Sequence, residues 1–321
     1  MTRDLIPRIT VLGSLNIDIV SYVSHHPLPG ETINAEQVSI SQGGKGANQA
    51  VACAKLSRTP SLLQPTANVS MVGAVGDDCY GSLLVNSLKS YGVDTSGIVV
   101  NKGNSGLAVV IVDELTGENR IVLSPGANHT LLPARFPEIP GPRPDLLILQ
   151  LEIPTSTVLS VLAKAKETGV PVLLNPAPAQ QLPLDAYVNL AYLVMNETET
   201  SVLSGCAESD LHDVKGVRRA AETFIDKGVH NVIITLGGRG VFFLDKNRKS
   251  TLIPAATTKV VDTTAAGDTF IGAYALSLVQ NAGRGIDMEA ALRAANKAAS
   301  KTVARKGASI SIPWRDELEE S

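Results

Sequence analysis

The sequence predicts a doubly wound α/β fold, in which helices cover both faces of a mostly parallel sheet and a small second β-sheet forms a lid. Three observations lead to this prediction. Short apolar runs alternate with Ala- and Leu-rich segments of helical spacing, polar or glycine-rich stretches follow several of these runs, and two regions interrupt the alternation. A strand–helix rhythm of this kind is typical of an open sheet whose ligands bind beyond the carboxyl ends of the strands.

The apolar runs show no polar alternation, which indicates parallel strands that are buried on both faces. They are, in chain order, "ITVLG" (9–13), "PDLLILQLE" (144–152), "VPVLLNPAP" (170–178), "AYLVMNE" (191–197) and "NVIITLG" (231–237). The segments between them that have helical spacing are Ala47–Leu56, Ser82–Tyr91, Ser156–Thr168 and Arg218–Lys227.

Two regions, about 17–41 and 98–123, contain no good helix. They hold the strand-like stretches "ETINAEQVSIS", "GLAVVIVDE" and "NRIVLSPG", and the turn "LTGEN" joins the last two. We expect strands from the two regions to pair into a small sheet that lies over the site as a lid. The alternative is that they are edge strands of the main sheet. The whole chain, 1–321, is expected to form one domain.

Composition excludes several classes of function. The 321 residues are 44% hydrophobic and 18% charged, with a net charge of -3, so no general attraction to nucleic acid or an anionic membrane is expected. No apolar run is long enough to span a membrane, and the first residues leave no room for a signal peptide. The three cysteines have no paired spacing, which indicates reduced thiols and no structural metal. We expect a cytoplasmic protein, also nuclear if its source is eukaryotic.

The usual nucleotide-binding fingerprints are missing. No GxxxxGK[ST] occurs, so the chain is not a P-loop enzyme. No strict GxGxxG follows the first strand, which disfavours a dinucleotide-binding dehydrogenase.

The stretch "VVDTTAAGDTF" (260–270) instead places an acid behind three very small residues at the start of an apolar helix. Helix N-termini attract anions, and Ala265, Ala266 and Gly267 would let a phosphate approach the backbone N–H groups. Asp268 could then accept a proton from a hydroxyl that attacks this phosphate. The alternative is that Asp268 only complements the helix dipole.

Two glycine- or turn-rich stretches near the N-terminus are further candidates. "SQGGKGANQA" (41–50) places three glycines before an Ala-rich helix, which suggests that a ligand lies against the backbone, and Lys45 and Asn48 supply polar groups. In "GSLNID" (13–18), Asn16 and Asp18 share one face of an extended chain and could contact one polar ligand. A simple turn is the alternative for this second stretch.

Three more stretches follow predicted strands. Glu152 ends "LLILQLE", where a doubly wound sheet keeps its ligand-binding groups. Asn196–Glu199, "NETE", is also compatible with a helix capping box. Thr235–Gly240, "TLGGRG", is also compatible with a glycine-rich hairpin turn.

Taken together, these motifs resemble the ribokinase family of sugar kinases, the PfkB-type carbohydrate kinases. "GGKGANQA" and "DTTAAGDTF" match the two family signatures, and "GSLNID", "LQLEIP", "NPAPA", "NETE" and "VARKGASISIPW" occur in family order over nearly the whole chain. The stretch 58–68, which we expect to be a surface loop because of its two prolines, is a few residues longer than is usual in the family.

The resemblance implies a role for each matching residue. Asp268 would be the catalytic base, and the N–H groups of Ala265, Ala266 and Gly267 would form the anion hole. The implied sugar ligands are Asn16, Asp18, Gly44, Lys45, Asn48, Glu152 and Asp268. The implied ATP-binding residues are Asn196, Thr235, Leu236, Gly237, Gly238, Arg239, Gly240, Gly267 and Asn296. Glu199 would bind Mg²⁺ through water. The implied K⁺ ligands, many through backbone carbonyls, are Asp262, Thr264, Thr302, Arg305, Gly307 and Ser311.

The activity that the resemblance implies is ATP-dependent phosphorylation of D-ribose at O5, with Mg²⁺ and K⁺ as cofactors and a homodimer formed through the β lid. A sibling kinase for 2-deoxyribose, another sugar or a nucleoside is the nearer alternative. A catalytically inactive sugar sensor of the same fold is the more distant one.

Overall fold

The computed structural model describes residues 6–283 and 285–319 and contains two sheets. The main sheet has nine strands in the order β13-β12-β11-β10-β9-β8-β1-β4-β5. Its strands are β1 (Arg8–Leu12), β4 (Asn68–Gly76), β5 (Asp94–Asn101), β8 (Leu146–Leu149), β9 (Val172–Leu174), β10 (Tyr192–Asn196), β11 (Asn231–Thr235), β12 (Val241–Asp245) and β13 (Ser250–Ile253). From β5 to β11 all neighbours are parallel, and β12 and β13 are antiparallel. The predicted fold class is confirmed.

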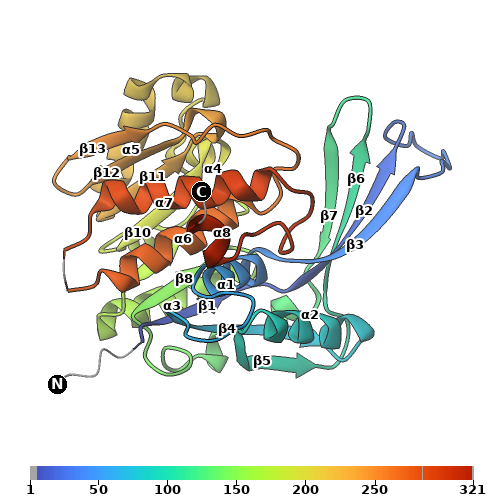
Figure 1. Cartoon of the computed structure of the whole chain (residues 1–321), viewed down its shortest axis with the longest axis horizontal. Helices are drawn as coiled ribbons and strands as arrows, with labels where there is room; N and C mark the ends of the chain where they lie inside the picture. The colour runs from blue at the N-terminus through green and yellow to red at the C-terminus, as the bar shows by residue number, and fades with distance from the viewer. Residues whose placement is uncertain (1–5, 284, 320–321) are drawn as a thin grey trace.

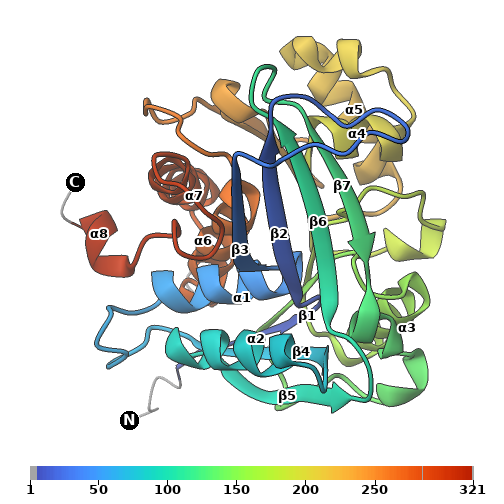
Figure 2. The same ribbon diagram turned by 90° about the vertical axis from the view of Figure 1, so that its right-hand side faces the viewer.

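Helices cover both faces of this sheet (Figures 1 and 2). The helices are α1 (Lys45–Leu56), α2 (Cys79–Ser90), α3 (Thr155–Thr168), α4 (Glu197–Ser204), α5 (Val214–Asp226), α6 (Ala266–Gln280), α7 (Met288–Val303) and α8 (Arg315–Glu319). Side chains of β1 alternate between two apolar cores: Ile9 and Val11 pack with α1, α6 and α7, whereas Leu12 packs with α3 and α5. This alternation follows from the two-residue period of a strand.

The second sheet has the order β3-β2-β6-β7 and stands out from the body of the molecule (Figure 1). Its strands are β2 (Asn16–Val23), β3 (Gln37–Gly43), β6 (Gly106–Asp113) and β7 (Asn119–Ser124). The alternative that these strands are edges of the main sheet is therefore wrong for all four.

The predicted bounds of the lid need two corrections. Residues 98–101 belong to β5, which pairs with β4 at the edge of the main sheet. The sequence does not distinguish the two positions, because an apolar run carries no feature that specifies which sheet it joins. Residues 31–36 form no strand, and β3 begins only at Gln37.

The predicted surface loop 58–68 contains no helix or strand before β4 begins at Asn68. It is fixed at one end by Arg58, whose buried guanidinium donates to the carbonyl oxygens of Gly92 (2.7 Å) and Ala67 (3.1 Å). The single-domain prediction spans 1–321 and so includes residues 1–5, 284 and 320–321, which lie outside the described residues.

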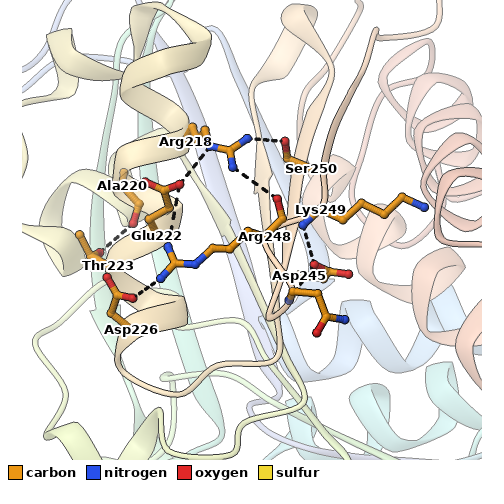
Figure 3. A network of polar contacts seen from close by, with 10 residues as sticks. Arg218, Ala220, Glu222, Thr223, Asp226, Asp245, Arg248, Lys249 and Ser250 are labelled. Carbon is orange, nitrogen blue, oxygen red and sulfur yellow. Dashed lines mark hydrogen bonds and ion pairs between the residues drawn. The ribbon is translucent and has the colours of Figure 1, made fainter.

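The hairpin of β12 and β13 is held to α5 by a polar network on the surface (Figure 3). Arg218 donates to Glu222 (3.0 Å) and to the Ser250 hydroxyl (2.8 Å), and Arg248 pairs with Asp226 (2.5 Å). No helix in the described part of the chain is long and apolar enough to cross a membrane.

Candidate active site

Polar side chains gather at the carboxyl ends of four neighbouring strands, β1, β8, β9 and β10. Asn16 follows β1, Glu152 follows β8, Asn175 follows β9 and Asn196 ends β10. Because these strands are parallel and adjacent, the four residues meet at one edge of the sheet. This is the edge where an open α/β sheet binds its ligands.

Glu152 joins β8 to the start of α1. Its Oε2 accepts hydrogen bonds from the Ser14 hydroxyl (2.5 Å), the backbone N–H of Lys45 (2.9 Å) and the Asn16 amide (3.5 Å). Lys45 is the first residue of α1, so the carboxylate also lies at the positive end of the helix dipole. Three of the predicted sugar ligands, Asn16, Lys45 and Glu152, are thus brought together.

Asn16 is held by a residue that the sequence analysis missed. Asn128 is buried, and its Nδ2 donates to Asn16 Oδ1 (2.8 Å) while its Oδ1 accepts from the backbone N–H of Leu15 (2.9 Å). Asn128 lies in a short 3-10 helix, Gly126–Thr130, whose sequence carries no distinctive pattern. Ser14 was also missed, although it lies within the stretch that was singled out.

Asp18 lies in the same cluster, and its carboxylate has a raised affinity for a proton. Burial raises its pKa to about 7, and the nearby carboxylates of Glu152 and Asp268 add to this effect. The ionised form of Asp18 is therefore disfavoured where water is excluded and other acids are close.

The three glycines at the start of α1 lie in close contact with other parts of the protein. A Cβ on Gly44 would lie 2.8 Å from the backbone nitrogen of Asn16, and a Cβ on Gly46 would lie 2.5 Å from that of Ser14. A Cβ on Gly43 would overlap the carboxylate of Asp18. These glycines let the start of α1 pack against the 14–18 segment of the protein itself. The close backbone approach expected of these glycines is therefore present, between two segments of the protein itself, and Gly44 also has a left-handed φ of 88°.

Asp268 lies in the first turn of α6 and is 9% exposed. It does not cap its own helix. Its Oδ2 accepts from Asn48 Nδ2 (3.2 Å) and its Oδ1 from Gln49 Nε2 (3.0 Å), both on α1. Burial raises the pKa of Asp268, and the Lys45 ammonium and the two amides counteract this only in part. The dipole-only alternative does not explain why two amides from another helix point at this carboxylate.

The backbone in front of Asp268 is turned in an unusual way. Ala265 has a left-handed φ of 60°, and the N–H of Ala266 donates to the carbonyl of Thr263 (3.2 Å). A Cβ on Gly267 would meet nothing within 4 Å, and within the described residues its N–H has no acceptor. The start of α6 is therefore open beside Asp268, as a phosphate would require.

Uncharged amides connect Asp268 to the next strands, and the sequence analysis missed all three of them. Gln49 Nε2 also donates to Asn175 Oδ1 (3.1 Å), and Gln49 Oε1 accepts from Gln150 Nε2 (2.7 Å). Asn175 Nδ2 donates to the Val194 carbonyl (3.0 Å) and to Glu199 Oε2 (3.4 Å). A polar residue inside an apolar strand run, as in "LLILQLE" and "VLLNPAP", was the signal that could have found Gln150 and Asn175.

Asn196 and Glu199 form the capping box that the sequence allowed. The backbone N–H of Glu199 donates to Asn196 Oδ1 (2.7 Å), and the backbone N–H of Asn196 donates to Glu199 Oε2 (2.9 Å). Burial raises the pKa of Glu199, and its hydrogen bonds and Lys45 oppose the rise. Both bonds to the carboxylate use Oε2, so Oε1 remains as an acceptor for a water of a metal ion.

Thr235–Gly240 forms the turn of the antiparallel pair β11–β12, as the hairpin alternative allowed. Gly237 and Gly238 are open on the side where a Cβ would lie. Arg239 is paired with Glu197 and donates to two backbone carbonyls of 211–212. Asn296 donates to the carbonyl of Pro254 (3.2 Å), and Gly240 packs against the same 253–255 segment, so Asn296 and the turn lie on one stretch of chain.

The residues expected to hold K⁺ lie in two segments that contact each other. Asp262 Oδ2 accepts from the N–H of Gly307 (2.9 Å), and the Thr302 hydroxyl lies 2.9 Å from that of Thr269 in α6. Arg305 N–H donates to the Thr302 carbonyl (3.0 Å). These segments offer carboxylate, hydroxyl and carbonyl oxygens, which suit a hard cation. Thr264 and Ser311 belong to the same two segments.

Comparison with known proteins shows the family to which this chain belongs. Residues 7–315 match the pfkB family carbohydrate kinase domain. A ribokinase of Schizosaccharomyces pombe is 44% identical over 95% of this chain and 94% of its own. A deoxyribokinase of Salmonella typhi is 35% identical over 97% of both chains. A structure of Arabidopsis thaliana ribokinase complexed with ribose and ATP superposes with a TM-score of 0.85, at 32% identity and 98% coverage of both chains. The resemblance found in the sequence is confirmed: this chain belongs to the pfkB family of carbohydrate kinases and is a sugar kinase.

Proposed function

We propose that this protein transfers the γ-phosphoryl group of ATP to O5 of D-ribose, giving D-ribose 5-phosphate and ADP. The observation that carries the proposal is the buried carboxylate of Asp268, which lies between an open helix N-terminus and a cluster of polar side chains. An anion site on one side and a hydroxyl-binding pocket on the other are what transfer of a phosphoryl group to a sugar needs.

The sugar pocket is assigned to residues that already lie around Glu152. These are Asn16, Asp18, Gly44, Lys45, Asn48 and Glu152. Each hydroxyl of a bound pentose would pair with a buried polar group, and an analogue that lacks one hydroxyl would leave that group without a partner.

Asp268 is assigned the role of general base. Its carboxylate accepts the proton of the sugar hydroxyl while the oxygen of that hydroxyl attacks the γ-phosphorus of ATP and the bond to the ADP oxygen breaks. A pKa raised by burial makes this carboxylate a better proton acceptor than an exposed one. The N–H groups of Ala265, Ala266 and Gly267 would face the transferring phosphoryl group, and the Ala266 N–H would give up its bond to the Thr263 carbonyl (3.2 Å) to do so.

The nucleotide is assigned to the other side of α6. Asn196, Gly267 and Asn296, with the turn Thr235–Gly240, would surround ATP, and Glu199 would hold Mg²⁺ through water. Mg²⁺ would neutralise charge on the phosphate oxygens. The K⁺ assigned to Asp262, Thr264, Thr302, Arg305, Gly307 and Ser311 would hold the loop before α6, because Asp262 in this loop already accepts from the N–H of Gly307 (2.9 Å).

We further propose that two copies pair through their lid sheets. The two edge strands of the lid, β3 and β7, carry exposed apolar side chains, among them Ile40 (57% exposed) and Val122 (68%). Clusters of this kind mark interaction surfaces. A cytoplasmic location, also nuclear in a eukaryote, is proposed on composition alone.

The experiment that tests the activity is ADP release from Mg·ATP with D-ribose, 2-deoxyribose or adenosine, each in K⁺ or Na⁺. Fast turnover of D-ribose that requires K⁺ is the expected result. Preference for 2-deoxyribose or adenosine would keep Asp268 as base but overturn the assignment of the sugar. Sugar binding with no turnover of any acceptor would indicate an inactive sensor.

A further inference from the structure

Gln49 is a buried amide in a helix face that is otherwise apolar. It is fully buried, and its neighbours along α1 on the same core include Ala52 and Cys53. Burying an amide is unfavourable unless its donors and acceptor are paired. A methionine or leucine would fill such a position without this requirement, so the hydrogen bonds of Gln49 explain its chemistry better than its volume does.

The orientation of the Gln49 amide is set by the oxygen atoms that its NH₂ group faces. Gln49 Nε2 donates to Asp268 Oδ1 (3.0 Å) and Asn175 Oδ1 (3.1 Å), and Gln49 Oε1 accepts from Gln150 Nε2 (2.7 Å). An amide NH₂ has two hydrogens, and both are used. The opposite orientation would place the Gln49 oxygen against a carboxylate oxygen.

Gln49 thereby connects two carboxylates of the site. On one side it donates to Asp268, and on the other its partner Asn175 donates to Glu199 Oε2 (3.4 Å). Both side chains are neutral. This series of hydrogen bonds therefore orients both acids without adding a positive charge, which would weaken Asp268 as a proton acceptor.

We propose that Gln49 is a positioning residue for phosphoryl transfer, which turns the Asp268 carboxylate toward the sugar hydroxyl. Through Asn175, Gln49 also fixes the position of the Asp268 carboxylate relative to that of Glu199. Gln49 bonds Oδ1 while Asn48 bonds Oδ2, so together they fix the plane of the carboxylate. The proposal rests on the proposed function, in which Asp268 is the base and Glu199 serves the metal.

The test compares Gln49→Met with Gln150→Met. Both residues are fully buried amides, and both variants keep the approximate shape of the side chain. Only Gln49 donates to Asp268, whereas Gln150 contacts Gln49 and neither acid. We expect kcat to fall about 10- to 100-fold in Gln49→Met, with KM for sugar and ATP within about threefold, and to fall less than about threefold in Gln150→Met.

Equal losses of kcat in the two variants, or an unchanged kcat in Gln49→Met, would overturn the proposal in favour of a packing role. A second variant, Gln49→Glu, keeps shape and polarity if the methionine variant folds poorly. Its carboxylate would lie against that of Asp268, so the acid limb of the kcat–pH profile should move to higher pH by about one unit or more. An unmoved limb would contradict the contact.

Failure of the proposed function is seen separately, in the unsubstituted protein. If D-ribose is not an acceptor but another sugar is, the variants are compared with that sugar. The proposal for Gln49 is then tested by the same comparison of the kcat losses in Gln49→Met and Gln150→Met. An unsubstituted protein that releases no ADP with any sugar overturns both proposals.

Discussion

The molecule contains two polar networks that are built in opposite ways. The network in Figure 3 joins α5 to the β12–β13 hairpin with full charges at the surface, where Arg248 is 46% and Asp226 63% exposed. The network around Asp268 is buried and consists mainly of uncharged amides, such as Gln49 and Asn175. Charges are inexpensive in water and contribute little there, whereas in the interior they are costly unless paired. The difference teaches that burial raises the pKa of the acid at the site, and that the neutral amides which orient this acid, together with Lys45, offset the rise only in part.

The largest expected effect is on the acid at the centre of the buried network. Asp268→Asn keeps the size of the side chain but cannot accept the proton, so turnover should fall by roughly 10²–10⁴ while ribose still binds. Steady-state kinetics and calorimetric titration with ribose measure the two quantities. Unchanged turnover in this variant would remove Asp268 from its role as base.

The next effect depends on pH and concerns Asp18. Its pKa is raised to about 7 from a usual 3.8. Between these two pH values the folded state therefore holds a proton that the unfolded state has lost. The stability contributed by the protonated form is complete below about pH 4 and is lost as pH rises to about 7. The free energy of unfolding of Asp18→Asn should therefore increase by roughly 2 to 4 kcal/mol, relative to that of the unsubstituted protein, as the pH rises from 4 to 8.

Urea unfolding at several pH values measures this gain. Glu222→Gln in the surface network is the control, because Glu222 pairs with arginine in water and should show no comparable change. A constant difference between Asp18→Asn and the unsubstituted protein at all pH values would show that Asp18 is well hydrated.

A smaller loss is expected from breaking an amide link in the interior. Asn175→Ala removes the acceptor of Gln49 and the donor to the Val194 carbonyl and to Glu199. Leaving these buried groups without partners should lower the free energy of unfolding by about 1–3 kcal/mol. Denaturant titration checks this value, and a loss below that of the surface variant described next would contradict the contrast between the two networks.

The smallest effect belongs to the surface. Arg248→Ala removes the pairs with Asp226 and Glu222 and should cost about 1 kcal/mol or less. The loss should shrink further in 1 M salt, where screening acts over a few ångströms. A larger loss that salt does not reduce would mean that this network carries more stability than its exposure suggests.

The fold and the motifs were predictable from the sequence because they depend on local patterns. Apolar runs located β1, β8, β9, β10 and β11, helical spacing located α1, α2, α3 and α5, and the acid behind "AAG" located the start of α6, whereas β4, β13 and α7 were not predicted. Gln49 and Asn128 were not found, because an isolated amide in a helix or a short 3-10 helix carries no periodic signal. Their role appears only when distant strands meet at one edge of the sheet.

The assignment of 98–101 to the lid was wrong for a related reason, and the glycines of 43–46 pose the same problem. The apolar residues of β5 do not specify which sheet they join, and a glycine needed for a protein backbone has the same sequence as one needed for a ligand. Tertiary partners decide both.

The base of the lid has a mechanical consequence. β2 begins at Asn16 and includes Asp18, and β3 ends at Gly43, which pairs with Asn16 and is separated from α1 by Gly44 alone. The lid sheet therefore cannot tilt without moving Asn16 and Asp18 relative to Glu152. The angle of the lid and the affinity for the proposed sugar would therefore depend on the same movement. With Asn16 and Asp18 as the proposed sugar ligands, a contact that fixes the outer end of the lid would change the dissociation constant of the sugar, and the sugar would change the affinity of that contact by the same factor.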